Sequence, residues 1–311
     1  MIVVFVNPRS RGSRRDPGLV PRMERVLGDA GRVIASRSLE ELAGSAAAMA
    51  AEPPWVIAVH GGDGTLHVTL TALIHAFAGK PLPPIAILGG GTMNVVTGSL
   101  QIRVAPLDYL ARLAAAARAG KQLTTIRRRC LRVGDRYGFV FGNGILANFL
   151  VEYYQGDAYG PLRAVLLMLR ILASAMVRGT LMRRVFKRFR GKVVVDDQTL
   201  EFPDLMAVGA GFVREVGMGF KLFDRADDDP DRFAVLAIHS GPLALFRDLW
   251  AVRNGRGIAS GRAFTGIARR LEITGQDAEM AYTIDGDIYR APGLLPVTPG
   301  PYISIVDPRR L

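Results

Sequence analysis

The chain has 311 residues, of which 49% are hydrophobic and 22% charged; these values fit a two-domain globular protein and exclude an intrinsically disordered one. The formal net charge of +12 predicts an anionic partner, such as a nucleotide, a nucleic acid or an acidic membrane surface. A single cysteine, Cys130, excludes an internal disulfide and fits a reducing compartment.

The amino-terminal run Ile2–Val6 reads as a buried strand that ends in the turn Asn7-Pro8. It lacks the basic region and the cleavage site of a signal peptide. No stretch reaches the roughly 18 uncharged apolar residues of a transmembrane helix. We therefore expect a cytoplasmic protein.

The first third of the chain alternates short apolar strands with helical stretches. The predicted strands are Ile2–Val6, Trp55–Val59 and Ile85–Leu88. Helical spacing is found in Leu19–Leu27, Leu39–Ala51, Leu66–Phe77 and Leu107–Ala119. This alternation predicts an α/β domain over residues 1–122, with a parallel sheet whose ligands bind beyond the carboxyl ends of the strands.

From about residue 123 the pattern becomes β-rich, which predicts a second domain over residues 123–311. Its expected strands are Leu123–Val133, Tyr137–Phe141, Lys192–Val195, Leu205–Val208, Phe233–Ile238, Leu271–Thr274, Met280–Ile284 and Tyr302–Val306. Short strands separated by Gly, Asp or Pro turns are typical of a β-sandwich. A basic helical insertion near residues 161–190 interrupts the series.

Gly61-Gly62-Asp63-Gly64-Thr65 is the most specific motif and follows a predicted strand directly. Consecutive glycines let main-chain N–H groups approach phosphate oxygens, and the helix that follows directs its positive end at the same anion. Asp63 fits such a site if it manages a metal or a proton. The alternative is a tight turn between strand and helix.

Two further strand ends carry polar or glycine-rich loops. Gly89-Gly90-Gly91-Thr92-Met93-Asn94 follows the third strand, and Asn7-Pro8-Arg9-Ser10 follows the first. The glycine run lacks the spacing of the dinucleotide fingerprint, and the chain contains no P-loop sequence. A flexible loop is the alternative for the glycine run. The four histidines show no metal-binding spacing.

Together these loops resemble the diacylglycerol kinase catalytic-domain family, which includes sphingosine and ceramide kinases and bacterial lipid kinases. The family's first loop is similar to Asn7-Pro8 through Gly12, with one extra residue here, and the Gly-Gly-Asp-Gly-Thr string is intact. Near the C-terminus the family's Asp-Gly-Glu corresponds to Asp285-Gly286-Asp287. The chain departs from the family pattern at three positions, namely Val68, Val95 and Asp287.

The resemblance implies a lipid kinase that uses ATP and Mg²⁺. It implies that Asp287 acts as the general base and that Asp63 lies beside the reacting hydroxyl and the Mg²⁺. The nucleotide-binding residues that it implies are Asn7, Ser10, Gly61, Gly62, Gly64, Thr65, Gly91, Thr92 and Asn94. The metal ligands that it implies are Asp285, Asp229 and Asp231. A hairpin turn is the alternative for Asp285-Gly286, and a solvated acidic loop for residues 224–231.

A basic segment, residues 163–192, contains nine Lys or Arg residues and lies in a stretch without any acidic residue. An apolar stripe at helical spacing accompanies it, formed by Leu162, Val165, Leu166, Leu169, Leu172, Ala173 and Met176. Basic amphipathic helices bind anionic membrane surfaces. We expect peripheral membrane association; the alternative is a core helix. No base-stacking aromatic pattern indicates nucleic acid.

The predicted function is phosphorylation of a hydroxyl on a diacylglycerol-like, sphingoid or ceramide lipid. Two other hypotheses stay open. One is a kinase of a soluble substrate such as NAD, because that group also carries Gly-Gly-Asp-Gly-Thr. The other is a catalytically weakened nucleotide- or lipid-binding regulator. The sequence also leaves a homodimer open.

Overall fold

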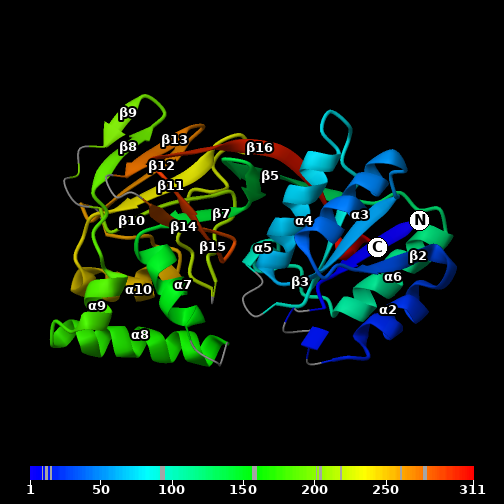
Figure 1. Ribbon diagram of the computed structural model, residues 1–311, viewed down its shortest axis with the longest axis horizontal. Helices are drawn as coiled ribbons and strands as arrows, with labels where there is room; N and C mark the ends of the chain where they lie inside the picture. Colours follow the sequence, from blue (N-terminus) through cyan, green and yellow to red (C-terminus); the bar gives the residue numbers. More distant parts are fainter. Residues whose placement is uncertain are drawn as a thin grey trace. The chain divides into compact units, whose positions relative to one another are not determined.

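The computed structural model describes residues 1–8, 10, 13–14, 16–91, 95–155, 160–200, 202, 205–217, 219–259, 261–275 and 279–311. The chain forms two compact units. Unit 1 comprises Met1–Arg128 together with Pro301–Leu311, and unit 2 comprises Arg129–Gly300. The C-terminal segment therefore belongs to the first unit, a return that the sequence did not indicate (Figure 1).

Unit 1 is built on a parallel sheet. Its strands, in spatial order, are β2 (Gly31–Ala35), β1 (Ile2–Val6), β3 (Val56–Gly61), β4 (Ile85–Gly89) and the end of β16 (Leu294–Val306). The last strand joins in parallel where Ile305 pairs with Ile85. The strands β1, β3 and β4 are almost entirely buried apolar runs, as expected of a parallel sheet covered on both faces.

Helices cover this sheet in two pairs, α2 with α6 and α3 with α4 (Figure 1). Their bounds are α2 Leu19–Leu27, α3 Leu39–Ala51, α4 Asp63–Ala76 and α6 Pro106–Arg118, and a short α5 spans Val95–Ser99. The sequence predicted α2 and α3 at these bounds. Ser38 begins α3 by accepting a hydrogen bond from the Glu41 main chain at 3.1 Å, the usual way to satisfy a helix end.

Unit 2 contains an antiparallel sheet of six strands that faces a second group of strands. The six-stranded sheet has the order β12 (Ala263–Ala268), β11 (Phe233–Ile238), β10 (Ala207–Gly211), β7 (Val140–Asn143), β14 (Met280–Ile284) and β15 (Asp287–Ala291). The facing group contains β13 (Leu271–Gly275), β8 (Gly191–Val195), β9 (Gln198–Leu200), β5 (Thr125–Val133), β6 (Arg136–Gly138) and the first part of β16.

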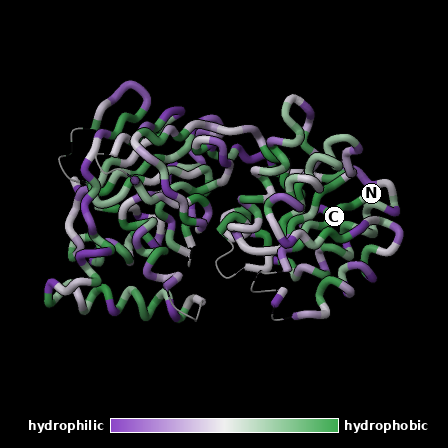
Figure 2. The backbone as a smooth tube through the Cα atoms, in the orientation of Figure 1, coloured by the Kyte–Doolittle hydropathy of each residue, from purple (hydrophilic) through white to green (hydrophobic). Residues whose placement is uncertain are grey.

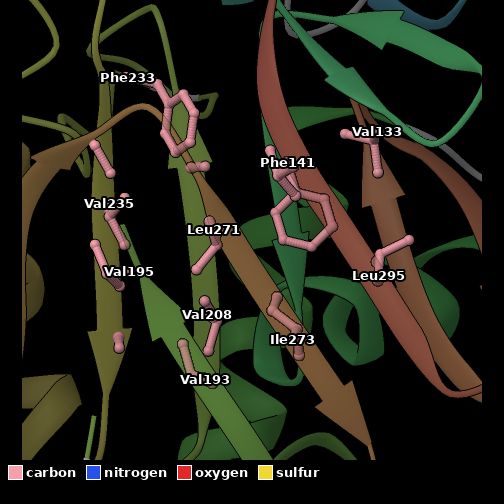
Figure 3. Close-up of a cluster of buried hydrophobic side chains, with 14 of the residues drawn as sticks. Val133, Phe141, Val193, Val195, Val208, Phe233, Val235, Leu271, Ile273 and Leu295 are labelled. Carbon is pink, nitrogen blue, oxygen red and sulfur yellow. The ribbon is translucent and has the colours of Figure 1, made fainter. Parts of the chain in front are cut away.

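The core of unit 2 lies between these two layers, so the predicted α/β fold with a C-terminal β-sandwich is confirmed. Val193, Leu271 and Ile273 from one layer pack with Phe141 and Val208 from the other (Figure 3). The inward residues of the two sheets interdigitate: β8 alternates more exposed and more buried positions, and β10 is buried throughout.

The described part of unit 2 contains four helices. They are α7 (Ile145–Tyr154), α8 (Pro161–Met176), α9 (Thr180–Val185) and α10 (Pro242–Arg253). Leu146 of α7 and Leu245 of α10 pack on a second apolar cluster, on the other face of the six-stranded sheet. The helix α8 packs against α7, α9 and α10 and forms the lower edge of unit 2 in Figure 1. Within the described residues, no helix is both long and apolar enough to cross a bilayer.

Candidate functional site

The strand order of unit 1 reverses beside β1. The chain passes from β1 to β2 on one side of β1, and then to β3 on its other side. Open parallel sheets bind ligands at such a reversal, outside the carboxyl ends of the strands, because the loops there diverge to opposite faces. The loops that follow β1 and β3 carry Asn7 and the predicted glycine string, so both lie at this reversal.

The loop after β3 is short because the helix α4 begins at Asp63, directly after Gly62. A Cβ on Gly61 would lie 2.5 Å from the Cβ of Thr65, closer than any real contact, so only glycine fits there. Gly62 at the helix cap offers no side chain to the first N–H groups of α4. Helix ends of this kind bind anions through their N–H groups and the helix dipole.

The second glycine loop lies against the first. The Gly90 N–H donates to the Gly61 carbonyl oxygen at 2.9 Å, and a Cβ on Gly62 would lie 3.2 Å from the Cα of Gly91. Main chain therefore approaches main chain at this place. The tertiary structure joins two glycine runs that lie almost thirty residues apart in sequence into one polar main-chain surface.

Polar side chains connect this surface with its neighbours. Asp63 accepts a long hydrogen bond, 3.4 Å, from the Val96 main chain of α5. Asn7 donates to the Thr65 hydroxyl at 3.4 Å, which links the end of β1 to the first turn of α4. Predicted residues from all three loops are thus brought together, while Thr92 and Asn94 lie outside the described residues.

Ser10 has a more local role in the structure. Its N–H donates to the Asn7 carbonyl oxygen at 3.0 Å, and its hydroxyl lies 2.9 Å from that of Ser13. These bonds form a turn after β1. The role of Ser10 in binding a nucleotide stays a prediction.

His60, at the end of β3, is buried under the second glycine loop. Its Nδ1 lies 2.9 Å from the Leu88 carbonyl oxygen, and a Cβ on Gly90 would lie 2.5 Å from its Cε1. Burial lowers the pKa of His60, and the Leu88 contact opposes this shift. The neutral imidazole therefore packs directly on the glycine main chain and leaves no room for a side chain there.

A pocket of about 250 Å³ lies beside this surface, at the ends of β1 and β2. Asn7, Thr65 and Val68 form one part of its wall, and residues 36–39 form another. Ser36, Arg37 and Ser38 were not among the residues predicted from the sequence, because β2 was not predicted. The available signal was the capping sequence Ser38 to Glu41, which marks the start of a helix and hence a loop before it.

In unit 2, Asp285 and Gly286 form the two-residue turn between β14 and β15. Both have positive φ, 47° and 93°, as a type I′ hairpin turn requires. The Asp285 carboxylate is buried and accepts hydrogen bonds from the N–H groups of Phe139 and Val140, at 3.0 and 2.8 Å. The hairpin alternative is therefore the observed conformation, and Asp285 joins this turn to the β6–β7 segment.

Asp287, the predicted general base, is the first residue of β15 and is half-buried. Burial raises the pKa of Tyr289 to about 12, and the negative charge of Asp287 contributes to this shift. The guanidinium of Arg136 lies over the Tyr289 ring, 4.4 Å from its centroid. Asp287 thus belongs to a cluster of charged and aromatic side chains from β6 and β15.

The acidic loop 224–231 is extensively paired with arginines. Asp231 forms an ion pair with Arg129, and Arg225 pairs with Asp228 at 2.7 Å. The Oδ1 atom of Asp229 accepts the Asp231 N–H at 2.8 Å. No group of three metal-binding side chains occurs in the described part of the chain. The predicted metal role of Asp229 and Asp231 therefore gains no support from this geometry.

Comparisons with known proteins find a family match within unit 1. Residues 1–126 match the family model described as diacylglycerol kinase catalytic domain. No curated protein matches the chain.

Solved structures share the fold across the whole chain. A Bacillus anthracis protein provisionally assigned as a diacylglycerol kinase has a TM-score of 0.71 at 15% identity, with 100% of this chain and 98% of that chain covered. A diacylglycerol kinase structure from the same organism has a TM-score of 0.63 at 14% identity, with the same coverage. The matched residues 1–126 hold both glycine loops, so the similarity to the diacylglycerol kinase catalytic domain includes the candidate site.

Proposed function

We propose that this protein is an ATP-dependent lipid kinase that transfers the γ-phosphoryl group to a hydroxyl of a diacylglycerol-like or sphingoid lipid. The observation that carries the proposal is the joined glycine surface, where Gly62 lies against Gly91 beside the start of α4. Its place in a diacylglycerol kinase catalytic-domain match supports the choice of reaction.

The glycine surface suits a polyphosphate. The helix dipole at the start of α4 favours anionic oxygens, and a main chain without Cβ atoms allows them to approach closely. The neighbouring pocket at Asn7, Thr65 and Val68 has polar and apolar walls, which suit a ribose and a base. We propose that the nucleotide places its phosphates on the glycine surface and its ribose and base in the neighbouring pocket.

Among the residues that the structure describes, no group of three carboxylate, imidazole or thiol side chains is arranged to hold Mg²⁺. Magnesium in kinases is held by one or two carboxylates together with the substrate phosphates, so a preformed protein cage is not required. Asp63, at the first turn of α4, is the residue that would hold it. The ion, when bound, neutralises charge on the transferring phosphoryl group.

In the proposed reaction the lipid hydroxyl oxygen forms a bond to the γ-phosphorus, and the bond between that phosphorus and the β,γ-bridging oxygen breaks. The hydroxyl proton passes to a carboxylate, and ADP leaves. Protein groups mainly position the reactants and offset charge in such transfers. Asp287 is the proposed proton acceptor, because it is the last acid of the Asp285-Gly286-Asp287 motif.

The decisive experiment measures ADP release and labelled product with diacylglycerol, sphingosine, ceramide or NAD as acceptor. We expect Mg²⁺-dependent labelling of at least one lipid and none of NAD. Labelling of NAD alone would establish a soluble-substrate kinase. ATP binding without turnover on any acceptor would establish a regulator, which is the outcome that the departures at Val68, Val95 and Asp287 motivate. Undiminished turnover in excess EDTA would contradict the metal-assisted mechanism.

A further inference from the structure

The helix α8 is apolar on two faces, but only one of them is buried in the protein. Ala164, Leu167 and Ile171 face inward and are at most 8% exposed. A helix that is apolar all round normally lies inside a protein core or in a lipid environment. In this structure α8 instead forms an edge of unit 2, and Figure 2 shows it as hydrophobic along most of its length.

The outward apolar residues of α8 form a continuous stripe. Leu162, Val165, Leu166, Leu169 and Met176 are each between 42% and 73% exposed, and we call them the α8 outer face. Their spacings of three, four and seven residues place them on one side of the helix. Single exposed leucines are common on protein surfaces, but a contiguous apolar stripe marks an interaction site.

The segment that contains α8 is strongly basic. From Gly160 to Val195 the sequence has no acidic residue. The basic side chains in this stretch that are exposed include Arg170, Arg178, Arg183, Arg184, Lys187, Arg188 and Arg190. Arg184 is paired with Glu152 of α7 at 2.8 Å. The stretch therefore combines an apolar stripe with an excess of positive charge.

We propose that the α8 outer face docks on the surface of an anionic phospholipid bilayer, with its leucines at the level of the acyl chains and the arginines at the headgroups. Interfacial helices bind in this way, with a strength set by apolar area and by attraction to anionic lipids. A second copy of the chain would face this positively charged surface with the same charge, which opposes association.

This inference deepens the proposed function, since a membrane-bound acceptor lies at the surface that α8 would contact. It differs from the sequence-based expectation in one respect. The sequence placed the emphasis on charge, whereas the exposed stripe predicts that apolar contact persists when salt screens the charges.

The experiment measures co-sedimentation of the full chain with phosphatidylcholine–phosphatidylglycerol vesicles, without nucleotide. We expect Leu162→Gln, Leu166→Gln and Leu169→Gln together to weaken binding by at least ~tenfold at both low and high salt, because apolar burial is lost. The triple change Arg170→Gln, Arg183→Gln and Arg188→Gln should weaken binding at low salt and have little effect at high salt.

Leu294→Gln is the matched control, because Leu294 is 52% exposed on β16, away from the helix. The Leu294→Gln variant should bind vesicles as strongly as the unchanged chain. All variants should have the same thermal unfolding midpoint as the unchanged chain. Wild-type binding by the leucine triple variant would overturn the proposal. So would a dimer of the unchanged chain that this variant converts to monomers, because the occupant would then be a second copy.

Turnover on a short-chain, monomeric diacylglycerol separates docking from catalysis. The leucine triple variant should keep full turnover on this substrate and lose it on vesicles. Vesicle binding without turnover on any lipid would leave docking in place and remove the proposed kinase function. A Leu166→Trp variant gives a direct check of insertion. Its fluorescence should shift to the blue with vesicles, and an unchanged spectrum would contradict insertion of α8.

Discussion

The dipeptide Asp-Gly occurs in both units, and its two settings are physically opposite. Asp63-Gly64 opens the helix α4, where the Asp63 carboxylate meets the Val96 N–H at a long 3.4 Å. Asp285-Gly286 turns a hairpin, where the Asp285 carboxylate is buried against two main-chain N–H groups at 2.8 to 3.0 Å. The first acid lies at the start of a helix, next to a glycine loop, and the second uses its carboxylate to hold strands together.

Acidic residues that look alike in the sequence can therefore have different roles, one in catalysis and another in stabilising the fold. In Asp285-Gly286-Asp287, the first acid is a structural turn residue and the last begins the next strand, half-buried. A pattern of acids along the sequence therefore does not show which carboxylate can accept a proton. Substitutions at Asp63, Asp287 and Asp285 should affect different measurements.

The largest effect is expected for Asp63→Ala. If Asp63 handles the metal or the reacting hydroxyl, turnover should fall by more than ~10⁴-fold, the upper range for a positioned acid–base group. Asp108→Ala is the matched control, because Asp108 also lies in the first turn of a helix, α6. Lipid phosphorylation measures both variants. Retention of a tenth of the turnover by Asp63→Ala would exclude a central role.

Asp287→Asn should lower turnover by roughly 10²–10⁴-fold and leave ATP affinity and thermal stability nearly unchanged, since Asn keeps the shape but cannot accept the proton. Asp197→Asn, at the exposed β8–β9 turn, provides the control. A loss smaller than tenfold would move the base role to another group, with Asp63 the next candidate.

Substitution of Asp285 should lower the stability of the fold, whereas substitution of Asp287 should lower turnover and leave stability nearly unchanged. We expect Asp285→Ala to lower the free energy of unfolding by about 3–5 kcal/mol, because two buried N–H groups lose their acceptor and alanine is strained at positive φ. Asp285→Asn should cost only about 1–2 kcal/mol, since Asn-Gly suits the same turn. Urea unfolding measures both. Equal stability of Asp285→Ala and the unchanged chain would contradict the structural role.

The smallest effect concerns the glycine loop itself. Gly90→Ala should lower the free energy of unfolding by about 1–3 kcal/mol, because its Cβ would overlap the His60 ring. Gly44→Ala is the matched control in α3, where no atom lies within 4 Å of the new Cβ. It should instead stabilise the protein by about 0.5–1 kcal/mol, the usual helix preference. Similar shifts in both variants would show that the loop is loosely packed.

Much of the fold could be read from local periodicity. Ile2–Val6, Phe233–Ile238 and Met280–Ile284 have the bounds predicted from their apolar runs. The strand β2 was missed because Arg32 interrupts its short apolar run and most of its residues are only partly buried. The first part of β16 was also missed. Its prolines argue against a strand, although Leu294 to Val297 pair with β13.

For the candidate site, the sequence identified the residues but not their contacts. The glycine strings and Asp63 were evident because few other functions need those residues in that order. The pocket wall at Ser36 and Arg37 could not be found without β2. The predicted roles of Ser10, Asp229, Asp231 and Asp287 stay predictions, and those of Thr92 and Asn94 lie outside the described residues.

The sequence by itself determined the alternation of strands and helices in the first third of the chain apart from β2, the glycine loops and the basic character of residues 163–192, because each is a local pattern of apolar, small or charged residues. Tertiary structure alone decided that Gly62 lies against Gly91, that Asp285 is occupied by main-chain N–H groups, and that the α8 outer face is uncovered. Local periodicity reports which residues share a face. Whether another part of the chain covers that face, or bonds a given carboxylate, depends on contacts between residues distant in sequence.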